Sequence, residues 1–276
     1  MKLVRYKSNG SAKYGILEAD FVYDIIGDVY SDQFEKGPVV GGLEAVALLP
    51  PCEPKSITSI GANYVSRCKE NNLPVPTEPG AGDRFFIPVE ALTGPGKVIY
   101  LPPQEVRVEY SGELAIVIKR TCHQVSVAEA ADYILGYTIV HNVWAKNPVR
   151  GEPFGEFTSN IRAYESFCPT GPCVVTDIDP MNVAWQTRVN GEVRQKTNTS
   201  KMLFGPAEMV ASIASWHTLE PGDLIQCGTA SGVGTMKPGD MVEIEFEGIG
   251  VLRNMAVAGE DMEPGELIFI DRYTGD

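Results

Sequence analysis

Strand-like segments dominate this chain and do not alternate regularly with helical ones. Apolar runs of strand length stand between Gly-rich links, and they predict strands at Gly112–Arg120, Gly136–Trp144, Val183–Val189, Asp223–Cys227 and Met241–Glu247. Helices are predicted near Tyr64–Glu70, over Val127–Ile134 behind Ser126, and over Pro206–Ser215. A doubly wound sheet needs strands and helices in alternation. We therefore expect a β-rich α+β fold.

A proline-rich segment, Pro50–Pro54, divides the chain. The residues before it alternate short apolar runs with Gly and charged residues, which is typical of a small β-rich unit. We expect an N-terminal domain over residues 1–55 and a larger catalytic domain over residues 56–276. Residues 71–83 are too rich in Pro and Gly for regular structure and are a candidate mobile lid.

Composition narrows the class of partner. The net charge is −13, and no basic cluster is visible, which argues against nucleic acid and against an anionic membrane surface. No apolar run approaches the roughly 18 to 20 residues that span a bilayer, and the N-terminal residues do not read as an export signal. The six cysteines lack paired spacing, so we expect reduced thiols in a cytoplasmic protein whose partner is a small molecule.

Five segments taken in order carry a family resemblance. They are GPGKVIYLP at Gly94–Pro102, ESFCPTGP at Glu165–Pro172, Asn190–Phe204, TLEPGDLIQCGTASGVG at Thr218–Gly234, and Lys237–Asn254. Together the segments resemble the fumarylacetoacetate hydrolase family, over about Ser56–Asn254. The resemblance implies the family's C-terminal domain fold, a mixed β-sandwich or roll, behind a small β-rich N-terminal unit. It also implies a homodimer.

The resemblance places the family's metal ligands on substituted positions. Relatives hold a divalent cation through a Glu-x-Glu pair and an Asp, and the matching residues are Ser111, Glu113 and Asn142. Residues two apart share one face of a strand, and hard cations prefer carboxylate oxygens. One carboxylate in place of three predicts no metal cofactor; a weak Mg²⁺ or Mn²⁺ site is the alternative. Glu109 could replace a ligand, or be a solvated strand-end charge. Glu113 could line a pocket, or pair structurally with Arg162.

The family's proposed catalytic dyad is also changed. Its His and Glu match Arg67 and Glu70, close to Tyr64. Arg is a poor base near neutral pH because its pKa lies above about 12. Arg67 could therefore form an exposed helix pair with Glu70, or close over the pocket and bind an anion. Arg162 matches a family lysine and stays close in sequence to an acidic residue, Glu165.

The substrate-side elements are retained. Gln195 and the loop Gly228–Gly234 match ligand-contacting positions, and Thr229 offers a hydroxyl and an N–H group. The glycines could equally serve only a tight connection between strands. Further candidates for substrate binding are Tyr64, Lys146 and Tyr164.

No histidine is placed for catalysis. By alternation, His141 points away from the face of Asn142. His123 follows a strand and should be exposed, and His217 could cap the end of the helix before it. A Ser-His-Asp or Cys-His nucleophilic system therefore has no basis in this sequence.

These observations predict an enzyme for a small enolisable 2-oxo acid or β-dicarbonyl compound. We expect metal-independent isomerase, cyclase, dehydratase or decarboxylase chemistry through an enolate. Glu113 or Glu70 would carry the proton, and Arg67, Arg162 or Lys146 would stabilise the oxyanion. The alternatives are a metal-dependent C–C bond hydrolase of the same family and a catalytically silent binding protein with this fold.

Overall fold

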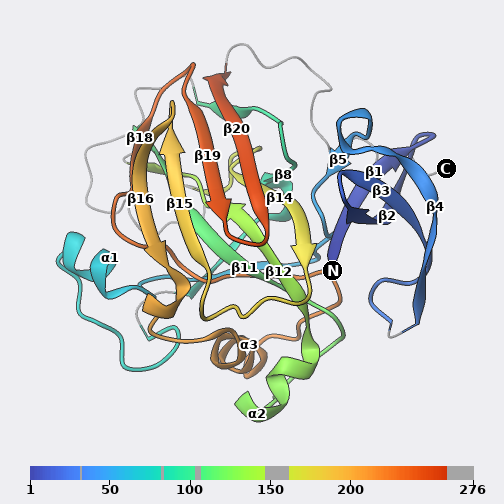
Figure 1. The fold of residues 1–276 in the computed structure, drawn as a ribbon. Helices are drawn as coiled ribbons and strands as arrows, with labels where there is room; N and C mark the ends of the chain where they lie inside the picture. Colours follow the sequence, from blue (N-terminus) through green and yellow to red (C-terminus); the bar gives the residue numbers. More distant parts are fainter. Residues whose placement is uncertain (32, 82–83, 103–106, 147–161, 260–276) are drawn as a thin grey trace.

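The described part of the chain is strand-rich, with its strands in three sheets and with short helices (Figure 1). The structure is a computed structural model that describes residues 1–31, 33–81, 84–102, 107–146 and 162–259. Among these residues, none of the helices has the length and apolar character needed to traverse a lipid bilayer. The predicted β-rich α+β class is confirmed, because strands build the core and the helices are peripheral.

The N-terminal strands form a meander that continues into the main sheet. The strands are β1 (Lys2–Ser8), β2 (Ser11–Glu18), β3 (Phe21–Gly27), β4 (Phe34–Gly42) and β5 (Leu48–Leu49). A short 3-10 helix, η1 (Leu43–Ala45), precedes β5. Strand β1 pairs with β2 along one edge; along its other edge it pairs with β14 (Cys168–Val175), where Lys2 lies opposite Val175, and then with β5. Backbone hydrogen bonds therefore join the two predicted domains within one sheet.

The main sheet runs in the order β4-β3-β2-β1-β14-β12-β11-β17-β6-β7. Its remaining strands are β6 (Ile57–Ile60), β7 (Arg84–Ile87), β11 (Gly112–Ile118), β12 (Ile134–His141) and β17 (Leu224–Gln226), with β8 (Leu92–Thr93) paired to β14. All seven residues of β11 are buried, as the unbroken apolar run after Glu113 predicts. Strand β11 therefore lies in the core and carries Glu113 into it.

A second sheet covers one face of β11 and β12 (Figure 1). It contains, in order, β16 (Glu192–Asn198), β15 (Ala184–Val189), β19 (Met241–Phe246), β20 (Gly250–Ala258) and β9 (Ile99–Leu101). The sheets approach so closely at Gly112 that an added Cβ would lie 2.6 Å from the hydroxyl of Thr187 and 2.8 Å from Ile244. Glycine at 112 thus permits the two sheets to approach this closely. Alternation along β11 places the neighbouring Glu113 on the opposite face of the strand.

The third sheet is small and consists of β13 (Trp144–Lys146), β10 (Arg107–Tyr110) and β18 (Gly234–Met236). The sequence predicts one strand over Gly136–Trp144, and this prediction is wrong at its end. Strand β12 stops at His141 and β13 begins at Trp144 in a different sheet. The break frees Asn142 from the strand ladder and lets its side chain turn toward Glu113.

The helices begin at the residues that the sequence predicts. They are α1 (Val65–Glu70), α2 (Val127–Ala130) and α3 (Pro206–Ala214), and the further 3-10 turns are η2 (Val89–Ala91), η3 (Ala131–Tyr133) and η5 (Thr199–Lys201). Ser126 and Glu129 form a capping box at the start of α2. The helix predicted over Val127–Ile134 is only one turn long, because the chain tightens into η3 before β12.

Two Pro-Gly-Asp turns lead into core strands and share one device. In each turn the aspartate accepts a hydrogen bond from the backbone three residues earlier, at 2.8 Å from Glu220 to Asp223 and at 2.9 Å from Lys237 to Asp240. Asp223 also accepts from the backbone of Lys55 and Ser56, both at 2.8 Å. The turn before β17 therefore also anchors the link between the two predicted domains.

Candidate active site

Glu113 is the centre of the candidate site. Its side chain is 2% exposed, and both carboxylate oxygens accept hydrogen bonds. Asn142 Nδ2 donates to Oε1 at 2.9 Å, and the backbone N–H of Gly228 donates to Oε2 at 2.8 Å. Gly228 has a φ of +78°, and a Cβ there would lie 2.9 Å from the carbonyl oxygen of Ile60. Glycine at this position is therefore required for the loop to aim its N–H at Glu113.

The environment raises the pKa of Glu113 from 4.5 to about 7. Burial is the largest cause, because it disfavours the charged form. The hydrogen bonds from Asn142 and Gly228 and the nearby charges of Arg162 and Arg67 act in the opposite direction. The result is a carboxyl group that exchanges a proton near neutral pH, the property required of a general base or acid.

Ser111, Glu113 and Asn142 do converge, but as a hydrogen-bonded cluster. The Ser111 hydroxyl donates to the backbone carbonyl of Asn142 at 3.0 Å, and the Asn142 amide donates to Glu113. The other amide atom, Asn142 Oδ1, is buried and has no protein hydrogen-bond partner in the described residues. It is a neutral acceptor beside a single carboxylate.

This donor set does not fit the divalent cation that the family implies. The one carboxylate already accepts two N–H groups, and the Asn142 nitrogen that points at it would repel a cation. Within the described ranges, no group of three or more His, Cys, Asp or Glu side chains is arranged to hold a metal ion.

Two guanidinium groups flank the ring of Trp144 close to Glu113. The Arg162 guanidinium carbon lies 4.1 Å from the ring centroid of Phe85 and 5.2 Å from that of Trp144. The Arg67 guanidinium lies 5.7 Å from the Trp144 centroid. Aromatic faces hold cations while leaving N–H groups for an anion. Two arginines held in this way can receive the negative charge of a carboxylate or an enolate.

Arg67 and Glu70 form the ion pair predicted at the i, i+3 spacing, and Glu70 also contacts a residue outside helix α1. Glu70 Oε1 also accepts a hydrogen bond from the backbone N–H of Gly232 at 2.9 Å. The Arg67 side chain is only 13% exposed. Glu70 therefore joins the helix to the Gly-rich loop and orients Arg67, which favours a positioning role over proton transfer.

Gln195 lies at the junction of the second sheet, strand β11 and the Gly-rich loop. Its Oε1 accepts from the backbone N–H of Gly112 at 3.0 Å and from the Thr187 hydroxyl at 2.9 Å. Its Nε2 donates to the Thr229 hydroxyl at 2.9 Å and to the carbonyl of Ala230 at 3.0 Å. The Thr229 hydroxyl donates in turn to the carbonyl of Gly112 at 2.8 Å. Gln195 and Thr229 therefore both bond the backbone of Gly112, at the start of β11, and so fix the position of the next residue, Glu113.

The remaining predicted binding residues are less closely tied to Glu113. Tyr64 is buried, and its hydroxyl accepts a hydrogen bond from the indole of Trp185 at 3.3 Å. The ring of Tyr164 packs on Phe167 with 4.9 Å between centroids. Lys146 belongs to β13, but its side chain is outside the described part of the chain. Substrate contacts from these three residues stay predictions.

The structure corrects one of the alternatives for Glu109, and places the histidines. Glu109 is not solvated: it is buried and pairs with Arg107 at 2.8 Å. His141 lies opposite Gly112 in the strand register, so it faces away from Glu113 as predicted, and burial lowers its pKa to about 3. His123 is exposed, as expected. His217 contacts the Ser56 hydroxyl at 3.1 Å through its ring, where the sequence suggested a cap on helix carbonyls.

Sequence reasoning missed the two aromatic residues that hold the arginines. Phe85 and Trp144 belong to different sheets and are 59 positions apart in the chain, so no local pattern links them. The available signal was the position of Trp144, two residues beyond Asn142 at the end of an apolar strand segment. An aromatic ring at such a place beside charged residues is a candidate cation platform.

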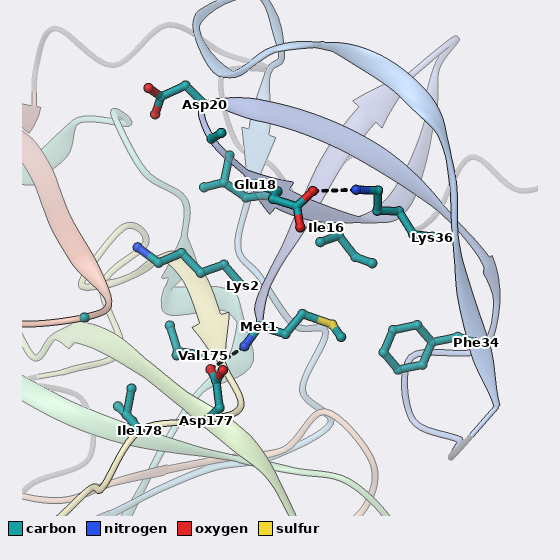
Figure 2. A pocket seen from close by; sticks show the side chains of 13 residues that line it. Met1, Lys2, Ile16, Glu18, Asp20, Phe34, Lys36, Val175, Asp177 and Ile178 are labelled. Atoms are coloured by element: carbon teal, nitrogen blue, oxygen red, sulfur yellow. Dashed lines mark hydrogen bonds and ion pairs between the residues drawn. The ribbon is translucent and has the colours of Figure 1, made fainter.

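A hollow of about 760 Å³ lies elsewhere, on the N-terminal strands (Figure 2). Two ion pairs lie in it, Lys36 with Glu18 and the Met1 ammonium with Asp177. None of the candidate catalytic or binding residues lines it. We therefore assign the chemistry to the Glu113 cluster.

Comparison with known proteins gives consistent matches over nearly the whole chain. The family profile "Fumarylacetoacetate (FAA) hydrolase C-terminal" matches residues 56–257, and "Rv2993c-like, N-terminal" matches residues 1–51. The mitochondrial oxaloacetate tautomerase FAHD2A of Bos taurus is 35% identical over 80% of this chain and 72% of its own length.

Two solved structures are similar in fold and differ in the activity that their names give. The 5-carboxymethyl-2-hydroxymuconate delta-isomerase of Mycobacterium smegmatis has a TM-score of 0.82 and 35% identity, covering 94% of this chain and 100% of its own. The maleylpyruvate hydrolase of Sphingobium sp. SYK-6, in complex with manganese(II) ion and pyruvate, has a TM-score of 0.76 and 26% identity, with the same coverage. Relatives of this chain thus include a tautomerase, an isomerase and a hydrolase.

Proposed function

We propose, from the premise that this chain belongs to the fumarylacetoacetate hydrolase family of enzymes, that it moves a proton on a small enolisable 2-oxo acid without a metal ion. The observation that carries the proposal is Glu113, a buried carboxyl group with a pKa near 7 that lies within electrostatic range of the guanidinium groups of Arg162 and Arg67. Such a group is ionised often enough to accept a proton and protonated often enough to return one. Tautomerisation or isomerisation of a 2-oxo acid needs both steps.

The proposed reaction uses only side chains of this protein. The Glu113 carboxylate removes a proton from the carbon next to the keto group, and the electron pair of that C–H bond forms the C=C bond of the enolate. The carbonyl oxygen takes up the negative charge, which Arg162 and Arg67 stabilise from their places on Trp144. Protonated Glu113 then returns the proton to the oxygen or to another carbon of the conjugated system. No step uses a metal-bound hydroxide.

The two arginines also favour an acidic substrate. A carboxylate accepts two parallel hydrogen bonds from one guanidinium, so one arginine can hold the carboxylate while the other faces the enolate oxygen. The oxaloacetate tautomerase and the hydroxymuconate isomerase among the relatives act, by their names, on compounds of this kind. We therefore place the substrate among small 2-oxo or 2-hydroxy-dienoic acids.

Hydrolysis of a C–C bond is the alternative, supported by the maleylpyruvate hydrolase among the similar structures. That reaction requires an activated water. In this chain the family's histidine position is Arg67, which is paired with Glu70 and cannot act as a base near neutral pH. We expect slow cleavage or none when an acylpyruvate is offered with Mg²⁺ or Mn²⁺.

The test is decay of the enol form of oxaloacetate, followed by its ultraviolet absorbance in chelator-treated protein. Wild type should accelerate ketonisation, and Glu113→Gln should lose at least about a hundredfold of that rate, the usual contribution of a general base. Glu243→Gln is the control, because Glu243 is a mostly buried glutamate that pairs with Arg188 and Arg253 in the second sheet, outside the cluster. Activity that requires added metal, or an equal loss in both variants, would reject the proposal.

A further inference from the structure

A row of buried polar side chains crosses four neighbouring strands, one alternation away from Glu113. The strand registers place Ser59 of β6 beside Gln226 of β17, Gln226 beside Ala115 of β11, and Ala115 beside Thr138 of β12. Residues directly opposite each other in a sheet share a face, and residues two apart on a strand do as well. The row therefore lies on the same face as Glu113, next to it in the direction of the strand.

Each of the three polar side chains in this row has one oxygen atom without a protein hydrogen-bond partner among the described residues. Ser59 Oγ, Gln226 Oε1 and Thr138 Oγ1 are each buried without a hydrogen-bond partner in the described part of the chain. The side chains of Gln226 and Thr138 are 0% exposed, and that of Ser59 is 1% exposed. A buried hydroxyl or amide without a partner costs roughly 1 to 3 kcal/mol, so three in one row call for a ligand.

In the row, Gln226 and Thr138 are separated by Ala115, whose side chain is a single methyl group. Gln226 Nε2 donates to the thiol of Cys168 at 3.4 Å, which closes the far side. A buried water typically makes about three hydrogen bonds to polar groups of this kind. Because these side chains are buried, a substrate that enters from the surface would not reach them, whereas a water molecule could be enclosed on folding.

We infer that Gln226 and Thr138 hold an internal water over Ala115, one strand alternation from the Glu113 carboxyl, with Ser59 one strand farther, beside Gln226. Two residues along a strand span about 6.6 to 6.8 Å, a gap that a single bridging water can cover. Water held there can pass a proton to and from Glu113. This relay rests on the proposed function, whereas the water site itself does not.

The direct test is a crystal structure at a resolution that shows ordered solvent, paired with unfolding of Thr138→Val in urea. We expect a solvent peak within hydrogen-bond distance of Thr138 Oγ1 and Gln226 Oε1. The substitution keeps the shape and removes one ligand of the water, so the ratio of folded to unfolded protein should fall on the order of fivefold to tenfold. Thr187→Val calibrates that loss, because Thr187 donates directly to Gln195 at 2.9 Å.

Opposite results overturn the inference. A dry row would show no solvent peak, and Thr138→Val would then be as stable as wild type or more stable, since it removes a hydroxyl with no partner. The relay is tested separately: Thr138→Val should lower kcat several-fold and leave KM unchanged. An unchanged kcat would reject the relay. Absence of any proton-transfer activity in wild type would reject the proposed function. The presence or absence of the solvent peak would still decide the water site.

Discussion

At the residue scale, Glu113 differs from an ordinary acidic side chain in how its charge is controlled. Burial disfavours the carboxylate, and two N–H donors and two arginines restore it only in part. Removal of any one of these groups should change the pKa of Glu113. Burial and these four groups together set the pKa of Glu113.

The first prediction concerns pH. If the ionised form of Glu113 is the base, kcat should rise with pH through about 7, the pKa of this group, and level off above it. Arginine does not titrate in this range, so the profile should have no second inflection from Arg67 or Arg162. The measurement is kcat from about pH 5 to about 9. A profile that rises near 4.5 would mean that an exposed carboxylate carries the reaction.

Stability should depend on pH in the opposite direction. The folded-state pKa of Glu113 lies above the value of 4.5 for an unperturbed side chain, so the folded state binds the proton more tightly than the unfolded state does. The stability gained from this group is full below about 4.5 and is lost as pH rises through about 7. Glu113→Gln cannot titrate, so its urea midpoint should decline less than that of wild type over this range. Parallel curves would contradict the assignment.

The second prediction restores the family's ligand set. Ser111→Glu together with Asn142→Asp places three carboxylates where Ser111, Glu113 and Asn142 now meet. Calorimetric titration of Mg²⁺ and Mn²⁺ into chelator-treated protein should then show binding in the double variant and little heat in wild type. Tight binding by wild type would mean that the ligands have been misassigned and that metal-assisted chemistry is the better hypothesis.

At the element scale, helix α1 and the loop after β17 act together because Glu70 joins them. The carboxylate holds Arg67 on one side and the N–H of Gly232 on the other. The same loop supplies the N–H of Gly228 to Glu113. A substitution of Glu70 can therefore affect the site in two ways, through Arg67 and through the loop that carries Gly228.

The third prediction follows from that link. Glu70→Ala should raise KM roughly fivefold and lower kcat much less, because the partly exposed ion pair that orients Arg67 is worth about 1 kcal/mol. Steady-state kinetics with a 2-oxo acid measures both constants. If kcat instead fell as far as in Glu113→Gln, Glu70 would be the proton carrier that the sequence left as an alternative.

At the scale of the whole molecule, the N-terminal strands and the catalytic strands belong to one sheet. Strand β1 covers the edge of β14, and Leu3, Val4 and Tyr6 are buried in the common core. The family profiles nevertheless meet between residues 51 and 56, where the sequence predicts a domain boundary. Because they share a sheet, we expect the two units to be stable only together.

The fourth prediction tests that dependence. A protein that begins at Ser56 would expose the edge of β14 and the apolar side chains beneath β1, an arrangement that promotes aggregation. It should therefore be insoluble or unfold at much lower urea than the full chain. A soluble fragment with the unfolding midpoint of the full chain would show that residues 56–276 fold independently.

The fifth prediction is a homodimer, which the family resemblance implies. Light scattering on the full chain after size-exclusion chromatography should give about twice the 30.0 kDa mass of one chain. A mass of one chain across the accessible concentration range would contradict it. Because the prediction comes from the resemblance alone, it stands apart from the site.

Local pattern determined much of this protein. Apolar runs between Gly-rich links specified β11, β15, β17 and β19, and capping and turn residues specified where α2, α3 and the two Pro-Gly-Asp turns begin, because each depends on neighbours within a few residues. The substituted positions Ser111 and Asn142 were likewise visible in the sequence. Only the tertiary structure decided that Asn142 turns toward Glu113, that Phe85 and Trp144 hold the arginines, and that β1 joins β14. These contacts join residues that are distant in the chain, and burial, which sets the pKa of Glu113, exists only once those residues have met.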